Sequence, residues 1–227
     1  MRNIIIALTI IMLACVSCKN ETNRLQNGDL LFVGLPLNYA LDTTDMASAI
    51  IESTGDTTAI NYIHVAIVEL DKKGDAWIID ATIKHGVDRY PLDTFLCDFT
   101  LNDGSYPTFD ILRVDGISED DAKRYVENAK NYIGCGYDMC FLPDNTEQYC
   151  SELVRNAYKH GENYIFNEYP MNFKSDDGTF PKYWQDIFAL LQQPIPQDIP
   201  GTNPNGMIKE ECLKKVYCNI LDFKNQK

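Results

Sequence analysis

The segment from Tyr62 to Ala81, YIHVAIVELDKKGDAWIIDA, decides the fold, because its pattern predicts two paired strands. Residues 62–70 and 76–81 are rich in β-branched and aromatic residues, and a polar turn separates them. If the turn is a three-residue hairpin loop with Gly74 in the left-handed conformation, Asp71 pairs with Asp75. The segment is therefore predicted to be an antiparallel hairpin of defined register.

This register brings a histidine and a carboxylate to one face of the hairpin. His64 and Ala66 point the same way, and Asp80 falls opposite Ala66, so His64 and Asp80 are diagonal neighbours. Diagonal positions lie about 7–8 Å apart, and a β-bulge could bring the side chains closer. Asp80 would then hold the imidazole in one tautomer. Without such a partner, a histidine on an apolar face is more often a buried structural residue.

The sequence on either side of the hairpin predicts both helices and strands. Ser118 is followed by three acidic residues, which favours a helix start, and Gly134 ends the same periodic stretch. We expect strands at residues 28–33, 62–70, 76–81 and 109–114, and helices at residues 45–53, 118–134, 147–160 and 184–191. The four prolines of residues 194–205 argue against regular structure there.

Cys150 is the residue of the chain best suited to nucleophilic catalysis. It lies in Tyr149–Val154, YCSELV, near the N-terminal end of a predicted helix. Unpaired backbone N–H groups and the helix dipole stabilise a thiolate at such a position, and they could also bind the oxyanion of an acyl-transfer intermediate. A cysteine nucleophile needs a neighbouring base, commonly histidine, and a group that orients this base.

The chain has three histidines, so the choice of base is narrow. His64 is the candidate because Asp80 accompanies it. His85 precedes a glycine in a predicted loop, and His160 falls at a predicted helix C-terminus, where a positive charge complements the dipole. We expect His85 and His160 to be structural or on the surface.

The cysteines that follow the N-terminal segment form no recognisable metal or disulfide pattern. A domain of this size does not depend on disulfides, even in an exported protein. Cys135 and Cys140 have four residues between them, with no CxxC pair and no nearby HxxxH. We therefore expect no metal and no cofactor. The six cysteines are Cys97, Cys135, Cys140, Cys150, Cys212 and Cys218.

The N-terminal segment is typical of export. Arg2 precedes an apolar run, Ile4–Ala14, which has the length of a signal-peptide core and is too short to span a bilayer. Small residues before Cys18 resemble a bacterial lipoprotein signal, in which the cysteine is lipidated. Cys15 is nearly as good a candidate, and an ordinary cleaved signal peptide is the alternative. We predict a signal peptide over 1–17, a tether over 18–26 and one domain over 27–227, lipid-anchored in the cell envelope.

Composition narrows the remaining possibilities. Of the 227 residues, 45% are hydrophobic and 11% aromatic, which is enough for a substantial core. The formal net charge is −13 and no stretch is rich in Lys and Arg. We therefore expect no nucleic-acid partner, because phosphate-backbone binding needs clustered basic residues. Contact with a membrane is expected only through the N-terminal lipid anchor.

The segments around His64, Asp80 and Cys150, in their order along the chain, resemble the permuted papain-like amidases of the YiiX/YaeF type, which are relatives of the NlpC/P60 peptidases. In the unpermuted relatives the nucleophile precedes the histidine, whereas here His64 precedes Cys150; a circular permutation preserves the spatial site. The resemblance implies an α+β, circularly permuted papain-like fold, in which the nucleophile's helix packs on a small antiparallel sheet or barrel. It covers most of residues 27–200 and rests on Gly28–Phe32, Ile63–Val68, Asp80-Ala81, Gly86-Val87, Pro91-Leu92, Gly134–Asp138 and Tyr149–Val154.

Carried over by motif, the resemblance also implies roles for individual residues. Cys150 would be the nucleophile and His64 the general base. Asp80 falls where the family usually has an orienting acid, often the longer Glu. Tyr137, within Gly134–Asp138, matches a tyrosine that lines the site and contacts substrate, although a packed core tyrosine would look the same.

Two classes of function remain open at this point. A hydrolase would cleave a peptide or N-acyl amide through a thioester, and an envelope location favours murein peptides as its substrate. An amidase or acyltransferase acting on N-acyl or lipid substrates is a variant of this class. A non-catalytic surface module that binds peptide or carbohydrate is the other class. The presence of all three candidate residues favours the enzyme.

Overall fold

The computed structural model describes residues 24–36, 39, 42, 45–56, 59–143 and 145–223. In chain order its elements are β1 (Leu30–Leu35), α1 (Met46–Thr54), β2 (Asn61–Leu70), β3 (Ala76–Thr82), β4 (Gly86–Pro91), α2 (Leu92–Asp98), β5 (Thr108–Val114), α3 (Glu119–Lys130), α4 (Cys150–Ala157), β6 (Lys159–His160), β7 (Asn163–Tyr164), β8 (Tyr169–Pro170), α5 (Lys182–Leu191), β9 (Pro200–Gly201), α6 (Pro204–Met207), β10 (Leu213–Val216) and α7 (Ile220–Phe223).

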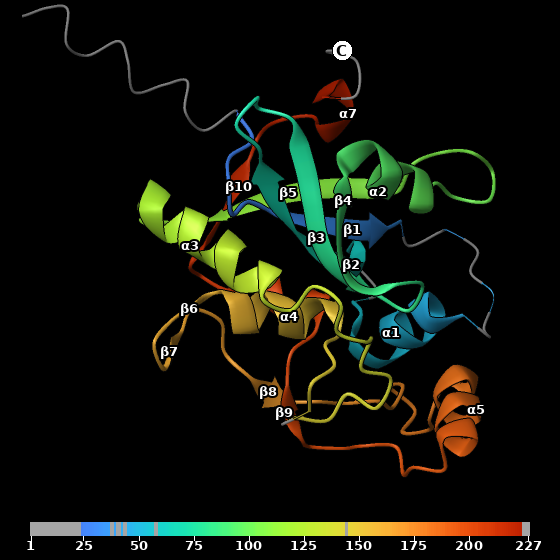
Figure 1. Cartoon of the computed structure of the whole chain (residues 1–227). Coiled ribbons are helices and arrows are strands. Elements are labelled where there is room, and N and C mark those ends of the chain that lie inside the picture. The colour runs from blue at the N-terminus through green and yellow to red at the C-terminus, as the bar shows by residue number, and fades with distance from the viewer. Residues whose placement is uncertain are drawn as a thin grey trace, which may run out of the picture.

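An antiparallel sheet of six strands, in the order β10-β5-β1-β2-β3-β4, forms the centre of the fold (Figure 1). The predicted hairpin is its β2–β3 pair. The Asp71 N–H donates to the Asp75 carbonyl oxygen at 2.9 Å, and Gly74 is left-handed with φ 84°. Ile67 lies opposite Ile79, so the predicted register is confirmed.

Helices cover both faces of this sheet. The face that carries Val65 and Ile67 packs against α3 and α4, whereas the face that carries Ala66 and Val68 packs against α2. The predicted alternation of side chains along β2 is therefore confirmed. Burial of both faces also explains why this strand is apolar almost throughout.

A third apolar cluster lies beside the sheet, where α1 and α5 pack together (Figure 1). Tyr149, the residue immediately before the candidate nucleophile, belongs to it. This cluster therefore forms part of the wall beside Cys150. Its buried members are Ala49, Phe141, Tyr149, Met171, Phe173, Trp184 and Phe188.

The predicted helix over residues 147–160 is wrong at both ends. The chain before α4 is extended, because Gln148 bridges to Tyr137 and donates its N–H to the Gly136 carbonyl at 3.0 Å. The helix ends at Ala157, after which β6 pairs with β7 in a small hairpin. His160 therefore lies in a short strand, and not at a helix C-terminus.

Other boundaries also differ from the prediction. α3 ends at Lys130, and turns continue the chain to Gly134. The proline-rich segment contains β9 and the start of α6, where Pro204 occupies a first-turn position that tolerates proline. β4 and α2 were not anticipated.

The predicted signal peptide, Cys15, Cys18 and the first part of the tether lie outside the described residues. Within the described part of the chain, every helix is too short or too polar to cross a membrane.

Candidate active site

His64 lies at an irregularity in the pairing of β1 with β2. Val33 is opposite His64, but the next residue, Gly34, is opposite Tyr62, so one extra residue is accommodated in β2. Gly34 makes this possible, because a Cβ there would lie 2.5 Å from the side chain of Ile60. A bulge of this kind bends its strand and redirects the adjacent side chains.

The imidazole of His64 contacts the carboxylate of Asp80. Nε2 of His64 lies 2.8 Å from Oδ2 of Asp80, and the two residues are 7% and 0% exposed. The ring of Phe99 packs against the imidazole with its centroid 4.9 Å away. Asp80 therefore engages one ring nitrogen, which leaves Nδ1 for a second partner.

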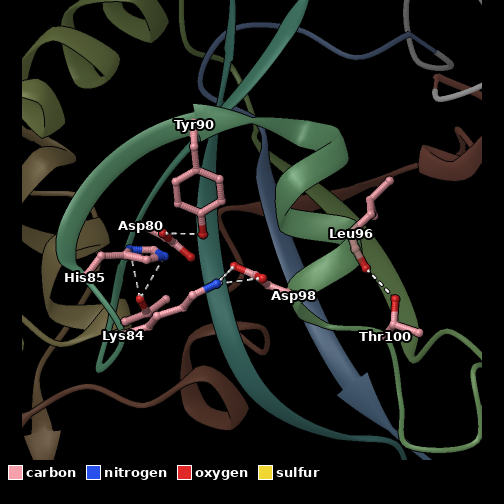
Figure 2. Close-up of polar contacts among 8 residues, drawn as sticks. Asp80, Lys84, His85, Tyr90, Leu96, Asp98 and Thr100 are labelled. Carbon is pink, nitrogen blue, oxygen red and sulfur yellow. Dashed lines mark hydrogen bonds and ion pairs between the residues drawn. The ribbon is translucent and has the colours of Figure 1, made fainter.

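The second oxygen of Asp80 is held by a residue that the sequence pattern did not indicate. Tyr90 donates its hydroxyl hydrogen to Oδ1 of Asp80 at 2.8 Å (Figure 2). In the β3–β4 register Tyr90 is opposite Ile78, which places it on the same face as Asp80. Burial and the negative charge of Asp80 raise the pKa of Tyr90, so its hydroxyl remains a donor. This contact can be predicted from the sequence only if β4 is recognised as a strand that pairs with β3.

Of the other two histidines, His85 is close to this region without touching the carboxylate. It lies in the turn between β3 and β4, hydrogen-bonds Thr82 at 3.1 Å and packs edge-on against the ring of Tyr90 (Figure 2). His160 lies in β6 and is exposed. His64 is thus the histidine that accompanies a buried acid.

Cys150 is the first residue of α4 and is 5% exposed. α4 packs across β2 and β3, and this contact brings the thiol to His64. Glu152 fixes the start of the helix by accepting the Tyr149 N–H at 3.3 Å. The first-turn N–H groups of a helix lack intrahelical partners, so the sulfur lies where a developing negative charge is favoured.

The charge state of His64 follows from its neighbours. Burial opposes the imidazolium, but hydrogen bonds to Asp80 and to Cys150, together with their negative charges, outweigh it and raise the pKa of His64 to about 10. The histidine is therefore protonated at neutral pH when it faces a Cys150 thiolate. The arrangement can support an ion pair in which sulfur is the nucleophile and the imidazolium is the proton donor.

Tyr137 lies next to Cys150 because its segment runs alongside the chain that leads into α4. It is half-buried, and its hydroxyl contacts the Met46 sulfur at 3.8 Å. Burial, followed by the negative charge of Cys150, raises the pKa of Tyr137. The buried Asp138 carboxylate anchors the loop that follows, accepting the N–H groups of Cys140, Phe141 and Leu142 at 2.8–3.0 Å.

Two cavities meet at the Cys150–His64 pair. One has a volume of about 40 Å³ and is lined by Cys150, whereas the other, of about 220 Å³, is lined by His64. Ile50 and Tyr137 line both cavities. A bond that is attacked by the Cys150 sulfur and protonated by the His64 imidazole would therefore lie where the two cavities meet, between Ile50 and Tyr137.

Two paired strands carry the histidine and the acid, His64 in β2 and Asp80 in β3, and they face a cysteine at a helix N-terminus that comes later in the chain. This order of elements defines a permuted papain-like cysteine enzyme. The family model for the permuted papain-like amidases YaeF/YiiX, peptidase family C92, matches residues 24–217. The chain belongs to this family and is a cysteine peptidase or amidase.

The fold is shared with a solved structure, that of metalloprotein YiiX from Escherichia coli O157:H7. The two chains are 21% identical and superpose with a TM-score of 0.65, covering 84% of this chain and 96% of the other. The predicted α+β, permuted papain-like fold is thereby confirmed. No curated protein matches this chain.

The six cysteines of the described domain are free thiols. Within the described residues, no group of three or more His, Cys, Asp or Glu side chains is placed to hold a metal ion.

Proposed function

We propose that the chain is an exported cysteine hydrolase that cleaves an amide bond with Cys150, His64 and Asp80 as its triad. The observation that carries the proposal is the buried 2.8 Å contact between His64 and Asp80, on an imidazole that also hydrogen-bonds Cys150. Asp80 orients the ring through one oxygen while Tyr90 holds the other. A thiol, an imidazole and a carboxylate, the groups that a nucleophile, its proton donor and an orienting acid would require, lie in one cluster, and this supports the proposal.

The proposed reaction has two steps. The Cys150 thiolate attacks the amide carbonyl and forms an S–C bond; the C–N bond then breaks as His64 gives its proton to the leaving nitrogen. In the second step neutral His64 takes a proton from water, the oxygen attacks the thioester carbonyl, and the S–C bond breaks to release a carboxylic acid. Backbone N–H groups at the start of α4 would stabilise the oxyanion in both steps.

The proposed substrate is a peptide or N-acyl amide. Murein peptides are a candidate because the N-terminal segment predicts a cell-envelope location. An acyltransferase on N-acyl or lipid substrates would share the first step and differ only in the acceptor that attacks the thioester. A non-catalytic binding module is not supported, because the chain belongs to an amidase family.

The proposed location can be tested separately from the chemistry. Metabolic labelling with a fatty-acid analogue should modify the wild-type protein and the Cys15→Ala variant, but not Cys18→Ala. Labelling that survives in Cys18→Ala and is lost in Cys15→Ala would move the anchor to Cys15. No labelling in any of the three would contradict a lipid anchor.

Acyl-enzyme trapping tests the proposed chemistry. The full chain is mixed with p-nitrophenyl butanoate and measured by intact-protein mass spectrometry within the first turnovers. We expect a species heavier by one butanoyl group, which digestion should locate on the peptide that contains Cys150, and no such species in Cys150→Ala. Equal p-nitrophenol release by Cys150→Ala, or an acyl group on another residue, would contradict the proposal.

A further inference from the structure

We propose that the two cavities at Cys150 and His64 together accept an amide with a short aliphatic acyl group on its carbonyl side and an uncharged group on its nitrogen side. This inference rests on the proposed function and specifies its substrate class. It follows from which cavity each reacting atom must occupy and from the side chains that line that cavity.

The chemistry assigns each cavity to one half of the substrate. The acyl half becomes bonded to sulfur, so it must extend into the cavity that contains Cys150 and not His64. The leaving nitrogen receives its proton from the imidazole, so its substituent must extend into the cavity that contains His64 and not Cys150. Ile50 and Tyr137, which line both, flank the scissile bond.

The acyl cavity is lined by uncharged groups. Aromatic and thioether side chains of the cluster between α1 and α5, among them Phe173 and Met171, form much of its wall. Among the described residues its lining includes no Lys, Arg, Asp or Glu. A charged acyl group would therefore lose its hydration there without gaining a partner.

The polar side chains of the same wall are already engaged within the protein. The hydroxyl of Ser53 accepts the Trp184 indole N–H at 3.1 Å. That of Thr202 donates to Ser151 at 3.0 Å. Few of these groups remain for a polar substrate, so the cavity favours an aliphatic chain.

The volume of the acyl cavity limits the length of that chain. A single water molecule needs roughly 10–15 Å³ of cavity volume. The acyl cavity, at about 40 Å³, therefore holds roughly three groups of the size of a water molecule. An acyl group of about four carbons therefore fits, whereas a chain of twelve carbons would extend out of this cavity.

The amine cavity is larger and is likewise without a counter-charge. Apart from His64, its described lining residues are apolar or hydroxyl-bearing, including Ile63, Ile83 and Phe99. His64 is already paired with Asp80 and Cys150, and no carboxylate among the described lining residues is available to pair with a cationic amine. Murein peptides carry several charged groups close to their peptide bonds, and neither cavity compensates such charges. The inference therefore narrows the proposed substrates to uncharged N-acyl amides and sets murein peptides aside.

A set of fluorogenic amides of 7-amino-4-methylcoumarin tests the inference on the full chain. The 4-methylpentanoyl and succinyl amides have matched shapes and differ in charge, and the butanoyl and dodecanoyl amides differ in length. We expect kcat/KM to be at least about 100-fold higher for 4-methylpentanoyl than for succinyl. We also expect butanoyl to exceed dodecanoyl by about 10-fold or more. Equal rates within either pair, or a higher kcat/KM for a murein tripeptide, would overturn the inference.

The outcome separates this inference from the proposed function. If no amide is cleaved and no acyl-enzyme forms, the proposed hydrolase fails. If a Cys150 acyl-enzyme forms but charged and uncharged acyl groups react alike, only the substrate class is wrong.

A surface variant tests the amine side with a matched control. Ile83 is 54% exposed and lines the amine cavity, whereas Ile133 is 43% exposed and lines neither cavity. Ile83→Glu should raise kcat/KM for a butanoyl amide with a cationic leaving amine, relative to one with a neutral amine, by about 10-fold. Ile133→Glu should leave this ratio unchanged. The same ratio in both variants would contradict the assignment of this cavity to the leaving group.

Discussion

The hydroxyl of Tyr90 lies 2.8 Å from Oδ1 of Asp80, the carboxylate oxygen that His64 does not use. Asp80 is therefore held at both oxygens and cannot rotate without breaking a buried hydrogen bond. Asp80 is one methylene shorter than a glutamate, the acid that the family resemblance often implies at this position. The bulge beside His64 helps explain how a diagonal pair still makes direct contact.

Tyr90→Phe should weaken the support of Asp80 without removing a member of the proposed triad. We expect unfolding free energy to fall by about 1–3 kcal/mol, because a buried carboxylate oxygen loses its donor. We expect kcat to fall by about 10-fold with KM nearly unchanged, which corresponds to about 1.4 kcal/mol in the barrier. Denaturant titration and steady-state kinetics measure both. Tyr217→Phe, at an exposed tyrosine, should change neither; unchanged kcat in Tyr90→Phe would show that Tyr90 does not support the triad.

Asp80→Asn should change the pH range of activity. The carboxylate helps to raise the pKa of His64 to about 10, so in the wild type the imidazolium is lost only near that pH. With the neutral amide, the pH at which kcat/KM declines on the alkaline side should fall by about one unit or more. A pH–rate profile from pH 5 to 11 measures this shift. An alkaline limit identical to that of the wild type would show that Asp80 does not stabilise the imidazolium.

Glu152 should make the stability of the fold depend on pH. Burial, opposed by the Tyr149 N–H and reinforced by the charge of Asp138, raises the pKa of Glu152 to about 8 from an ordinary 4.5. The contribution of Glu152 to the free energy of unfolding is therefore fully present below pH 4.5, and it is lost as the pH rises toward 8. Glu152→Gln keeps an acceptor for the Tyr149 N–H and should remove this loss.

Denaturant titration at pH 5 and pH 8 measures the effect of Glu152. Between these two pH values, the free energy of unfolding of the wild type should fall by up to about 3 kcal/mol more than that of Glu152→Gln. Glu162→Gln, at an exposed residue, is the control and should behave as the wild type. An identical pH dependence in wild type and Glu152→Gln would show that Glu152 ionises normally.

Cys150→Ala should separate chemistry from stability. We expect amide turnover to fall by at least about 10⁴-fold, because the nucleophile is removed. The free energy of unfolding should change by about 1 kcal/mol, because only one small side-chain atom is lost. Turnover above background in this variant would refute the cysteine mechanism.

The sequence predicted the hairpin and its register because both depend on local chemistry. The spacing of the polar turn and the conformation of Gly74 determine which residues of β2 and β3 are paired. Cys150 was also identifiable from its position before an apolar helical stripe. The start of α4 was misplaced because Gln148 pairs with Tyr137, a contact that follows from the tertiary fold.

Tyr90 and the two cavities could not be predicted for a related reason. Tyr90 reaches Asp80 only through the pairing of β3 with β4, a strand that the sequence pattern did not reveal. The cavity at Cys150 is formed by α1, the loop around Phe141 and the chain near Thr202, which are far apart in sequence. The cavity at His64 is formed by α1, β2 and the turn after β3, with Phe99 and Tyr137. Their shape depends on packing between distant segments.

The pairing of Cys150 with His64 is the central claim, and the pH dependence of alkylation tests it most directly. Iodoacetamide is applied to wild type and to His64→Ala, and the peptide that contains Cys150 is quantified by mass spectrometry at each pH. We predict rapid modification of the wild type at pH 6 and a much slower rate in His64→Ala at this pH, since an unpaired thiol titrates near pH 8.5. Profiles that coincide, both rising near pH 8.5, would contradict an activated pair.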